Sequence, residues 1–276
     1  MKPQFTNKLM SSFLLYLDNT ILTVGEAYTN HSSLFYPDAT NKYQGYYGYS
    51  APFKQLVSDQ SIAGANVMSG VYVDGAFTTS NVHVNHYNGQ VFFNSSQGSS
   101  KISGNYAVKD FNINMTSRAE TELLFETKFA LRPKTSQTLT GLDPNTNTYP
   151  AIYVKNLGGT NEPFAFGGTE NTIVNTRAVV LSDSAYSLDA VCSIMKDTKQ
   201  DYFNVYETGT LPFNALGIPA TGNYNYNSLG ANIGGAYIKD VTITTNIPSM
   251  SNDSSNPAIY PAFVDFRSEF IRTTTS

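Results

Sequence analysis

Histidine offers this chain its widest chemistry, because it can bind metals and move protons near neutral pH. The chain has three histidines, His31, His83 and His86. His83 and His86 stand three residues apart in a segment with strand periodicity, and side chains three apart on a strand point to opposite faces. Zinc needs three or four ligands at one point. The spacing therefore predicts no metal site.

The other reactive residue types lack the partners that catalysis needs. Cys192 is the only cysteine, so neither an intrachain disulfide nor a cysteine cluster can form. It falls on the apolar face of a predicted helix, where we expect a small core residue. No serine lies in a G-x-S-x-G motif, and no glycines match the dinucleotide or phosphate loops. The remaining candidates for paired acid–base chemistry are Asp110, Glu122, Glu126 and Asp189.

Nothing in the sequence selects two of these carboxylates at the separation that a glycosidase requires. Trp, which often stacks against sugars, is absent, although Tyr can take its place. We therefore expect a protein that is not an enzyme and that binds no cofactor.

The composition is typical of surfaces that contact other proteins. Charged residues make up 14% of the chain, against about 25% in an average soluble domain. Aromatic residues reach 13%, and the cores of interfaces lose charge and gain aromatic residues. An A·T-rich genome would produce the same bias through its codons, so both explanations stay open.

Charge and hydropathy exclude two classes of partner. The net charge is −4 without a basic stripe, which argues against sequence-independent nucleic-acid binding through phosphates. No stretch approaches the ~20 apolar residues of a membrane helix. The N-terminal apolar run, Phe13–Leu17, is too short for a secretion signal. We expect no contact with a membrane and synthesis in a cytoplasm.

Two helices are predicted from apolar spacing. Phe5, Leu9, Phe13, Leu17 and Ile21 recur every four residues and predict a helix over residues 5–24, which we expect to pack on its own domain rather than on a neighbouring subunit. A second helix is predicted over residues 184–202. Two acidic residues late in this second helix oppose its dipole and favour an early end.

Alternating apolar residues predict strands through most of the remaining chain. Predicted strands cover residues 71–73, 82–94, 111–115, 123–129, 151–154, 177–181, 237–244 and 262–271. Asn88-Gly89 predicts a type I′ hairpin turn, because both residues tolerate positive φ. The fold class is thus mainly β, an antiparallel sandwich or barrel-like body with long loops. Residues 1–276 are expected to form a single domain, with a boundary near residue 135 as the alternative.

Residues 28–53 show no periodicity and predict a long ordered loop. Tyr43, Tyr46, Tyr47 and Tyr49 gather in it. Tyrosine supplies large contact area at low entropic cost, so these four are interface candidates. The alternative is that they hold the loop on its own core. Residues 249–257 form a second predicted contact region or tip.

Several segments together resemble the β-core of structural proteins from the virions of tailed bacteriophages, near the head–tail junction. They are GVYVDGAF (70–77), YNGQVFFN (87–94), YAVKDFNI (106–113), ELLFETKF (122–129), NEPFAFGG (161–168) and FVDFRSEFIR (263–272). Within that group, neck connectors and tail-completion or terminator proteins are similar in size and in combining a β-body with one or two helices.

The resemblance implies a homo-oligomeric ring, usually six- or twelve-fold, that is assembled in the host cytoplasm and becomes part of the virion. Its partners would be further copies of itself and other neck, portal or tail proteins, with DNA at most passing through the lumen. The resemblance brings no catalytic residue. The alternatives are a capsid decoration, baseplate or fibre-associated protein, although the repeats typical of fibres are absent. A carbohydrate-binding module or an enzyme ranks below these.

Overall fold

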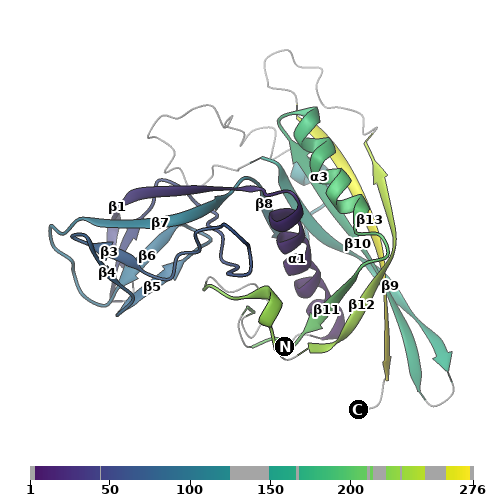
Figure 1. Ribbon diagram of the computed structural model, residues 1–276. Coiled ribbons are helices and arrows are strands. Elements are labelled where there is room, and N and C mark those ends of the chain that lie inside the picture. Colours follow the sequence, from purple (N-terminus) through teal and green to yellow (C-terminus); the bar gives the residue numbers. More distant parts are fainter. Residues whose placement is uncertain are drawn as a thin grey trace.

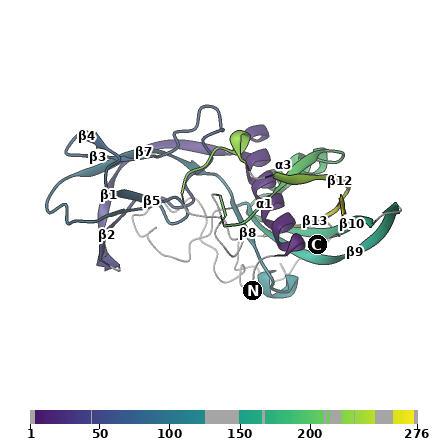
Figure 2. The same ribbon diagram turned by 90° about the horizontal axis from the view of Figure 1, so that it is seen from below.

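Two β-sheets flank one buried helix in the computed structural model of the chain (Figures 1 and 2). The structure describes residues 4–43, 45–124, 149–165, 168–209, 212–213, 222–230, 232–245 and 259–273. The fold is mainly β, as the sequence predicts, and both sheets are curled, one of them nearly into a barrel.

The first sheet is built from consecutive chain between residues 28 and 109. Its strands are β1 (Tyr28–Tyr43), β2 (Tyr46–Ser50), β3 (Val71–Val73), β4 (Ala76–Thr78), β5 (Val82–Asn85), β6 (Gln90–Phe93) and β7 (Ile102–Lys109). They pair antiparallel in the order β4-β3-β7-β1-β2-β6-β5. The curled inner face encloses a hydrophobic cluster that includes Phe35, Val91 and Tyr106.

The structure corrects the prediction of a loop over residues 28–53. Most of this segment is strand, and β1 pairs with β7 without interruption from Tyr28 opposite Lys109 to Phe35 opposite Ile102. The period of two is hidden in the sequence because apolar residues occupy both faces of β1. Phe35 is buried, whereas its neighbours Leu34 and Tyr36 are exposed.

The second sheet follows directly in the chain. Its strands are β8 (Asn112–Met115), β9 (Ala151–Ala165), β10 (Thr169–Ser182), β11 (Tyr202–Tyr206), β12 (Asn232–Thr244) and β13 (Tyr260–Thr273). Their order is β11-β12-β13-β10-β9-β8, and only the β8–β9 pair is parallel. The predicted strands at 151–154, 177–181, 237–244 and 262–271 are confirmed as parts of longer strands.

Alternation along β13 sets which face of the second sheet meets the core. Val264, Phe266 and Phe270 are buried, whereas Arg267 is exposed and Glu269 is partly exposed. The inner face packs against two helices, and the outer face carries the charges. This division confirms the half-buried strand that the sequence predicts.

The first helix, α1 (Phe5–Val24), has the predicted bounds. Its four-residue stripe of Leu9, Phe13, Leu17 and Ile21 is almost fully buried. Phe13 meets Phe203 of β11 at 5.4 Å and Phe266 of β13 at 4.9 Å between ring centroids. The helix therefore packs on its own chain, and it carries the largest hydrophobic cluster of the molecule.

The internal helix, α3 (Ala185–Asp197), is shorter than the predicted 184–202. Ser184 caps its start, because its Oγ accepts a hydrogen bond from the Ser187 N–H at 3.1 Å. The helix ends at Asp197, and Tyr202 already begins β11. The early end agrees with the unfavourable position of acidic residues near the C-terminus of a helix.

The turn between β5 and β6 also differs from its prediction. Asn85 pairs with Gln90, so the connection has the four residues His86 to Gly89 and not Asn88-Gly89 alone. Gly89 has φ 63°, whereas Asn88 does not adopt positive φ. The Asn85 side chain instead accepts a hydrogen bond from the Asn88 N–H at 3.1 Å. This local bond replaces the type I′ turn.

Three other predictions concern segments that are partly or wholly outside the described residues. Residues 120–124 are helical, which contradicts the start of the predicted strand at 123–129, and its remainder lies outside the described residues. The alternative domain boundary near residue 135 lies outside them too, as do residues 249–257. Within the described ranges, no helix is long and apolar enough to cross a membrane.

Candidate interaction surfaces

An apolar row crosses the outer face of the first sheet. Phe77 lies opposite Tyr72, Tyr72 opposite Ser103, and Ser103 opposite Leu34, so all four side chains share one face. Phe77 is 55% exposed and Leu34 is 44% exposed. The rings of Tyr72 and Phe77 lie 5.3 Å apart. These side chains stand outside the closed core and remain open to solvent.

The same face carries further rings towards β5. Tyr36 is exposed two residues after Leu34, and therefore on the same face. Phe92 lies opposite His83, and the ring of Tyr46 meets the His83 ring edge-on at 5.4 Å. We call Leu34, Tyr36, Tyr46, Tyr72, Phe77 and Phe92 the aromatic face.

Gly48 on β2 leaves room for the ring of Phe92 on the neighbouring strand β6. It lies opposite Phe92. A Cβ at this position would stand 3.1 Å from Cε1 of Phe92 and 2.8 Å from Oδ2 of Asp38. Asp38 also accepts hydrogen bonds from Ser50 and from Nε2 of Gln90, the latter at 3.0 Å. A polar cluster thus lies between Tyr36 and Phe92 on this face.

The four tyrosines singled out by the sequence do not form one surface. Tyr46 lies on the aromatic face, but Tyr49 is buried on the inner face, with its ring 5.6 Å from Phe93. Tyr47 is half-buried beside the same inner cluster. The side chain of Tyr43 lies outside the described residues. The alternation of side chains along a strand places neighbouring tyrosines on opposite faces of the sheet. Leu34, Tyr36 and Phe77, which lie on the exposed face, were not predicted from the sequence as surface candidates.

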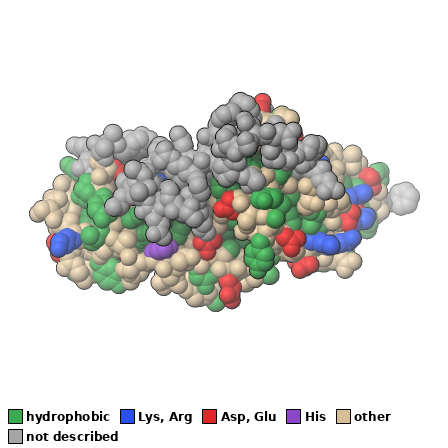
Figure 3. Space-filling view, turned by 90° about the horizontal axis from the view of Figure 1, so that it is seen from above, with side chains coloured by type: hydrophobic (Ala, Val, Ile, Leu, Met, Phe, Trp, Pro, Cys, Tyr) green, Lys and Arg blue, Asp and Glu red, His purple; other side chains and the backbone are tan. Residues whose placement is uncertain are grey.

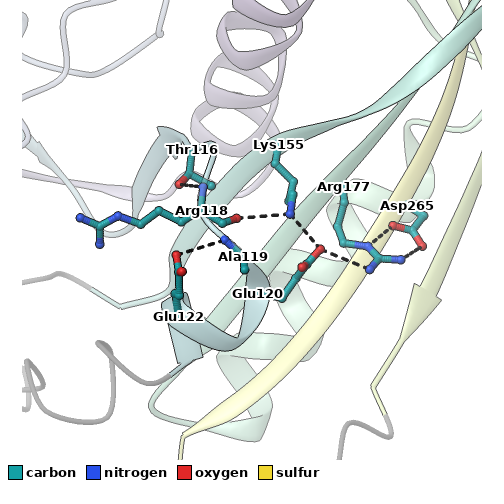
Figure 4. A network of polar contacts seen from close by, with 8 residues as sticks. All are labelled: Thr116, Arg118, Ala119, Glu120, Glu122, Lys155, Arg177 and Asp265. Carbon is teal, nitrogen blue, oxygen red and sulfur yellow. Dashed lines mark hydrogen bonds and ion pairs between the residues drawn. The ribbon is translucent and has the colours of Figure 1, made fainter.

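Ion pairs cross the outer face of the second sheet, as Figure 4 shows. Arg177 donates to both oxygens of Asp265, at 2.6 and 2.8 Å, and also lies 3.5 Å from Glu120. Lys155 reaches Glu120 at 3.2 Å and the Arg118 carbonyl at 3.2 Å. These bonds fasten the helical turn at 120–124 onto β9, β10 and β13.

In this network, each charged side chain lies beside one of opposite charge. The hydrogen bonds that Arg177 donates to Asp265 raise the pKa of Arg177 above its usual value. A hydrogen bond from its own backbone N–H, with help from Lys155, lowers the pKa of Glu120. Each group is held in its charged form, so the network is structural and offers no general acid or base.

Both signs of charge are interleaved elsewhere on the second sheet. Lys239 pairs with Glu269 at 2.7 Å, and Lys199 pairs with Asp240 at 2.8 Å. Figure 3 shows acidic and basic side chains scattered among apolar ones on one face of the molecule. Among the described residues of this face, the alternating charges form no continuous basic track for phosphates.

The histidines have structural surroundings. His86 was predicted on a strand, but it is buried in the turn after β5, where its Nε2 lies 3.0 Å from the Met68 carbonyl oxygen. The His31 ring stacks on Phe53 at 4.3 Å. In the described parts of the chain, no three His, Cys, Asp or Glu residues come together as a metal site.

Cys192 is a core residue, as predicted. It is buried on α3 among the main hydrophobic cluster. Burial raises the pKa of its thiol to about 11. Since the thiolate is the nucleophilic form, this cysteine is unreactive near neutral pH.

A buried polar joint connects the first sheet to α1. Lys109 at the end of β7 donates to both oxygens of Asp18, at 2.5 and 2.6 Å, and both side chains are nearly buried. Asp59 is fully buried and accepts from Nδ2 of Asn19 and from the backbone N–H groups of Ser61 and Tyr226, at 2.8 to 3.0 Å. These bonds fix α1 relative to β7 and to the segments that contain Asp59 and Tyr226.

Comparison with known proteins identifies no relative. No protein-family model matches the chain, and no curated protein sequence matches it significantly. Its function must therefore be inferred from its own surfaces.

Proposed function

We propose that this chain is a structural protein of a tailed-bacteriophage virion, which forms a ring at the neck or tail end and acts by protein–protein assembly without catalysis. The observation that carries the proposal is the aromatic face. Its rings stand in two groups on the outer face of one sheet, on either side of Asp38, Ser50 and Gln90. Large apolar side chains gathered on a solvent-facing surface are typical of sites that contact a partner.

The surrounding chemistry supports assembly. The rings of the aromatic face lie on a curled sheet whose inner face is already filled, so they add nothing to the core. Aromatic residues are the side chains that interfaces gather, and tyrosine dominates the contacts that matter most. The polar cluster of Asp38, Ser50 and Gln90 lies between Tyr36 and Phe92, and interfaces of this kind also carry hydrogen-bonding groups.

The ionisable side chains of the Arg177–Glu120 network and of the Asp59 joint are engaged in ion pairs or buried hydrogen bonds that hold the fold together. A ring uses a heterologous contact, so each copy presents two different patches that meet head to tail. Residues on a rigid sheet are suited to that purpose.

The test is the oligomeric state of the full chain. Light scattering after size-exclusion chromatography and negative-stain images are expected to show closed rings. A chain that remains monomeric at every concentration would contradict the proposal, and monomers that bind empty capsids would indicate a decoration protein instead.

A surface variant tests the role of the aromatic face. Leu34→Ser, Tyr36→Ser and Phe77→Ser together should shift the population to smaller species at unchanged thermal stability. Tyr186→Ser is the matched control, because Tyr186 is 87% exposed on α3, away from that face. Equal assembly of the triple variant and the control would remove the aromatic face from the contact.

A further inference from the structure

We infer that the second sheet continues from one copy of the chain to the next, with the outer edge of β9 in one copy pairing with the uncovered edge of β12 in its neighbour. This inference rests on the proposed ring and names two strands that would pair between neighbouring copies, in addition to the contact proposed for the aromatic face.

The outer edge of β9 is open along most of its length. β8 pairs only with residues Ala151 to Val154 of β9. Beyond them, β9 pairs with β10 on one side, and no other strand of the described chain lies along it. Every residue from 156 to 164 is exposed. Such an edge offers unpaired N–H and C=O groups to another strand.

The opposite side of the same sheet has a second open edge. β11 pairs with β12 only as far as Tyr237, and Ile238 exchanges backbone hydrogen bonds with Gln200 and Asp201. The following residues Val241–Thr244 pair with β13 alone among the described strands. The sheet therefore has one open stretch on each side.

β11 itself is a poorer partner because α1 closes part of its edge. The Tyr206 N–H donates to Oγ of Ser12 on α1 at 2.9 Å. Val205 and Tyr206 are buried there. Of the two strands on this side of the sheet, β12 thus presents the stretch that another copy can reach.

The strand directions fit a head-to-tail repeat. β12, β13, β10 and β9 are joined by three antiparallel pairings, so β9 runs opposite to β12. A second copy in the same orientation then brings its β12 antiparallel to β9 of the first. This contact uses two different patches, as a cyclic ring requires.

The two open stretches also have a suitable offset. The cross-strand pairs place Thr160 of β9 at the same height in the sheet as Tyr237 of β12, with Ile173 of β10 and Glu269 of β13 between them. In the same way, Thr242 of β12 stands at the height of Lys155 of β9. Counted on the regular strands β10 and β13, the offset is four residues, from Ile173 to Arg177, because β9 and β12 each contain one bulge residue in this interval. It is therefore ~13 Å across a four-strand repeat of ~19 Å. That slope is about 35°, which lies in the range of strand tilts in closed sheets.

Local features limit the length of the contact. A register shift interrupts β9 between Asn156 and Gly158, and Pro163 lacks an N–H. The usable edge is therefore Gly159 to Glu162. With Thr160 opposite Thr242, its residues Gly159–Asn161 lie antiparallel to Val241–Ile243. Gly159 is required for the intrachain pairing, since a Cβ there would lie 2.1 Å from the Ile173 carbonyl oxygen.

Two adjacent proline substitutions test the pairing. In an antiparallel ladder, successive N–H groups point to opposite sides. One of Thr160→Pro and Asn161→Pro therefore removes an N–H that faces β10, and the other removes an N–H at the open edge. We expect the variant that loses the N–H at the open edge to keep the wild-type melting temperature. It should need at least tenfold more protein to form rings, as measured by light scattering.

Cysteine crosslinking checks the partner strand. The chain has no other reactive thiol, because Cys192 is buried. Thr160→Cys combined with Thr242→Cys should give a ladder of oxidised oligomers on a denaturing gel. Thr160→Cys combined with Tyr186→Cys is the control and should give none, because Tyr186 is exposed on α3, outside both the aromatic face and the two strand edges.

The outcomes separate this inference from the proposed function. If the wild-type chain forms rings and both proline variants assemble equally well, or both cysteine pairs crosslink alike, the pairing is wrong and the ring proposal stands. If the wild-type chain forms no ring at all, both fail.

Discussion

At the scale of the residue, the most informative contact is the ion pair between Lys109 and Asp18. Both side chains are nearly buried, and they join β7 to α1 across 91 positions of sequence. Burying a charged side chain without its partner costs folding free energy, because the charge loses its contact with water. In a buried pair, the attraction between the two charges roughly offsets that cost. The pair therefore acts as a registry element between the first sheet and the helix.

Lys109→Met should lower the free energy of unfolding by about 3–5 kcal/mol, because it leaves the Asp18 carboxylate buried and unpaired. Adding Asp18→Asn should restore part of that loss. Lys199→Met is the control, since the Lys199–Asp240 pair is about half exposed and solvent weakens its attraction, so its loss should cost much less. Urea denaturation measures all three. Equal losses from Lys109→Met and Lys199→Met would contradict the buried role.

At the scale of the element, the turn between β5 and β6 shows how a short motif depends on its neighbours. Asn88-Gly89 favours a two-residue turn in isolation. In the protein, the Gly89 carbonyl accepts from the Ala51 N–H at 2.8 Å, and the Leu56 N–H donates to the His86 carbonyl at 2.8 Å. These contacts from the segment after β2 hold a wider turn and bury His86.

Gly89→Ala should destabilise the protein by about 2 kcal/mol or more. Its φ of 63° already disfavours a side chain, and a Cβ would lie 2.0 Å from the Phe53 carbonyl oxygen. Gly98→Ala is the matched control, because it has φ 58° with open space around it, and it should cost only about 1 kcal/mol. Thermal melts compare the two. The same loss for both would mean that the close approach to Phe53 is unimportant.

At the scale of the whole molecule, the two sheets share structural elements and should not unfold separately. The side chains of β7 alternate between the two cores, with Tyr106 and Val108 in the cluster of the first sheet and Ala107 in the main cluster around α1. The Lys109–Asp18 pair and the Asp59 hydrogen bonds add to this connection.

Single tryptophan reporters can test that coupling, because the chain has no Trp. Phe92→Trp reports on the first sheet, and Tyr237→Trp reports on the second; both parent side chains are partly exposed. We expect the two fluorescence transitions in urea to coincide with each other and with circular dichroism. Transitions that separate would show two independently folding units.

The sequence by itself determined the local patterns: the bounds of α1, the inward and outward faces of β13, and the core position of Cys192. Each follows from a repeat of two or about four residues, which short-range geometry sets. It also predicted Tyr46 as a surface candidate. Leu34 and Tyr36 were missed, although their spacing by two around Phe35 was a usable signal for an exposed strand face.

Only the tertiary structure decided which residues meet across the chain. It placed His86 in a buried turn, put Tyr46 and Tyr49 on opposite faces of a sheet, and joined Lys109 to Asp18. It also left parts of β9 and β12 with a partner on one side only among the described strands. None of these has a local signature, because each depends on contacts between segments tens of residues apart. Burial and strand order are properties of the assembled sheets, and a periodic pattern specifies a face without specifying what lies against it.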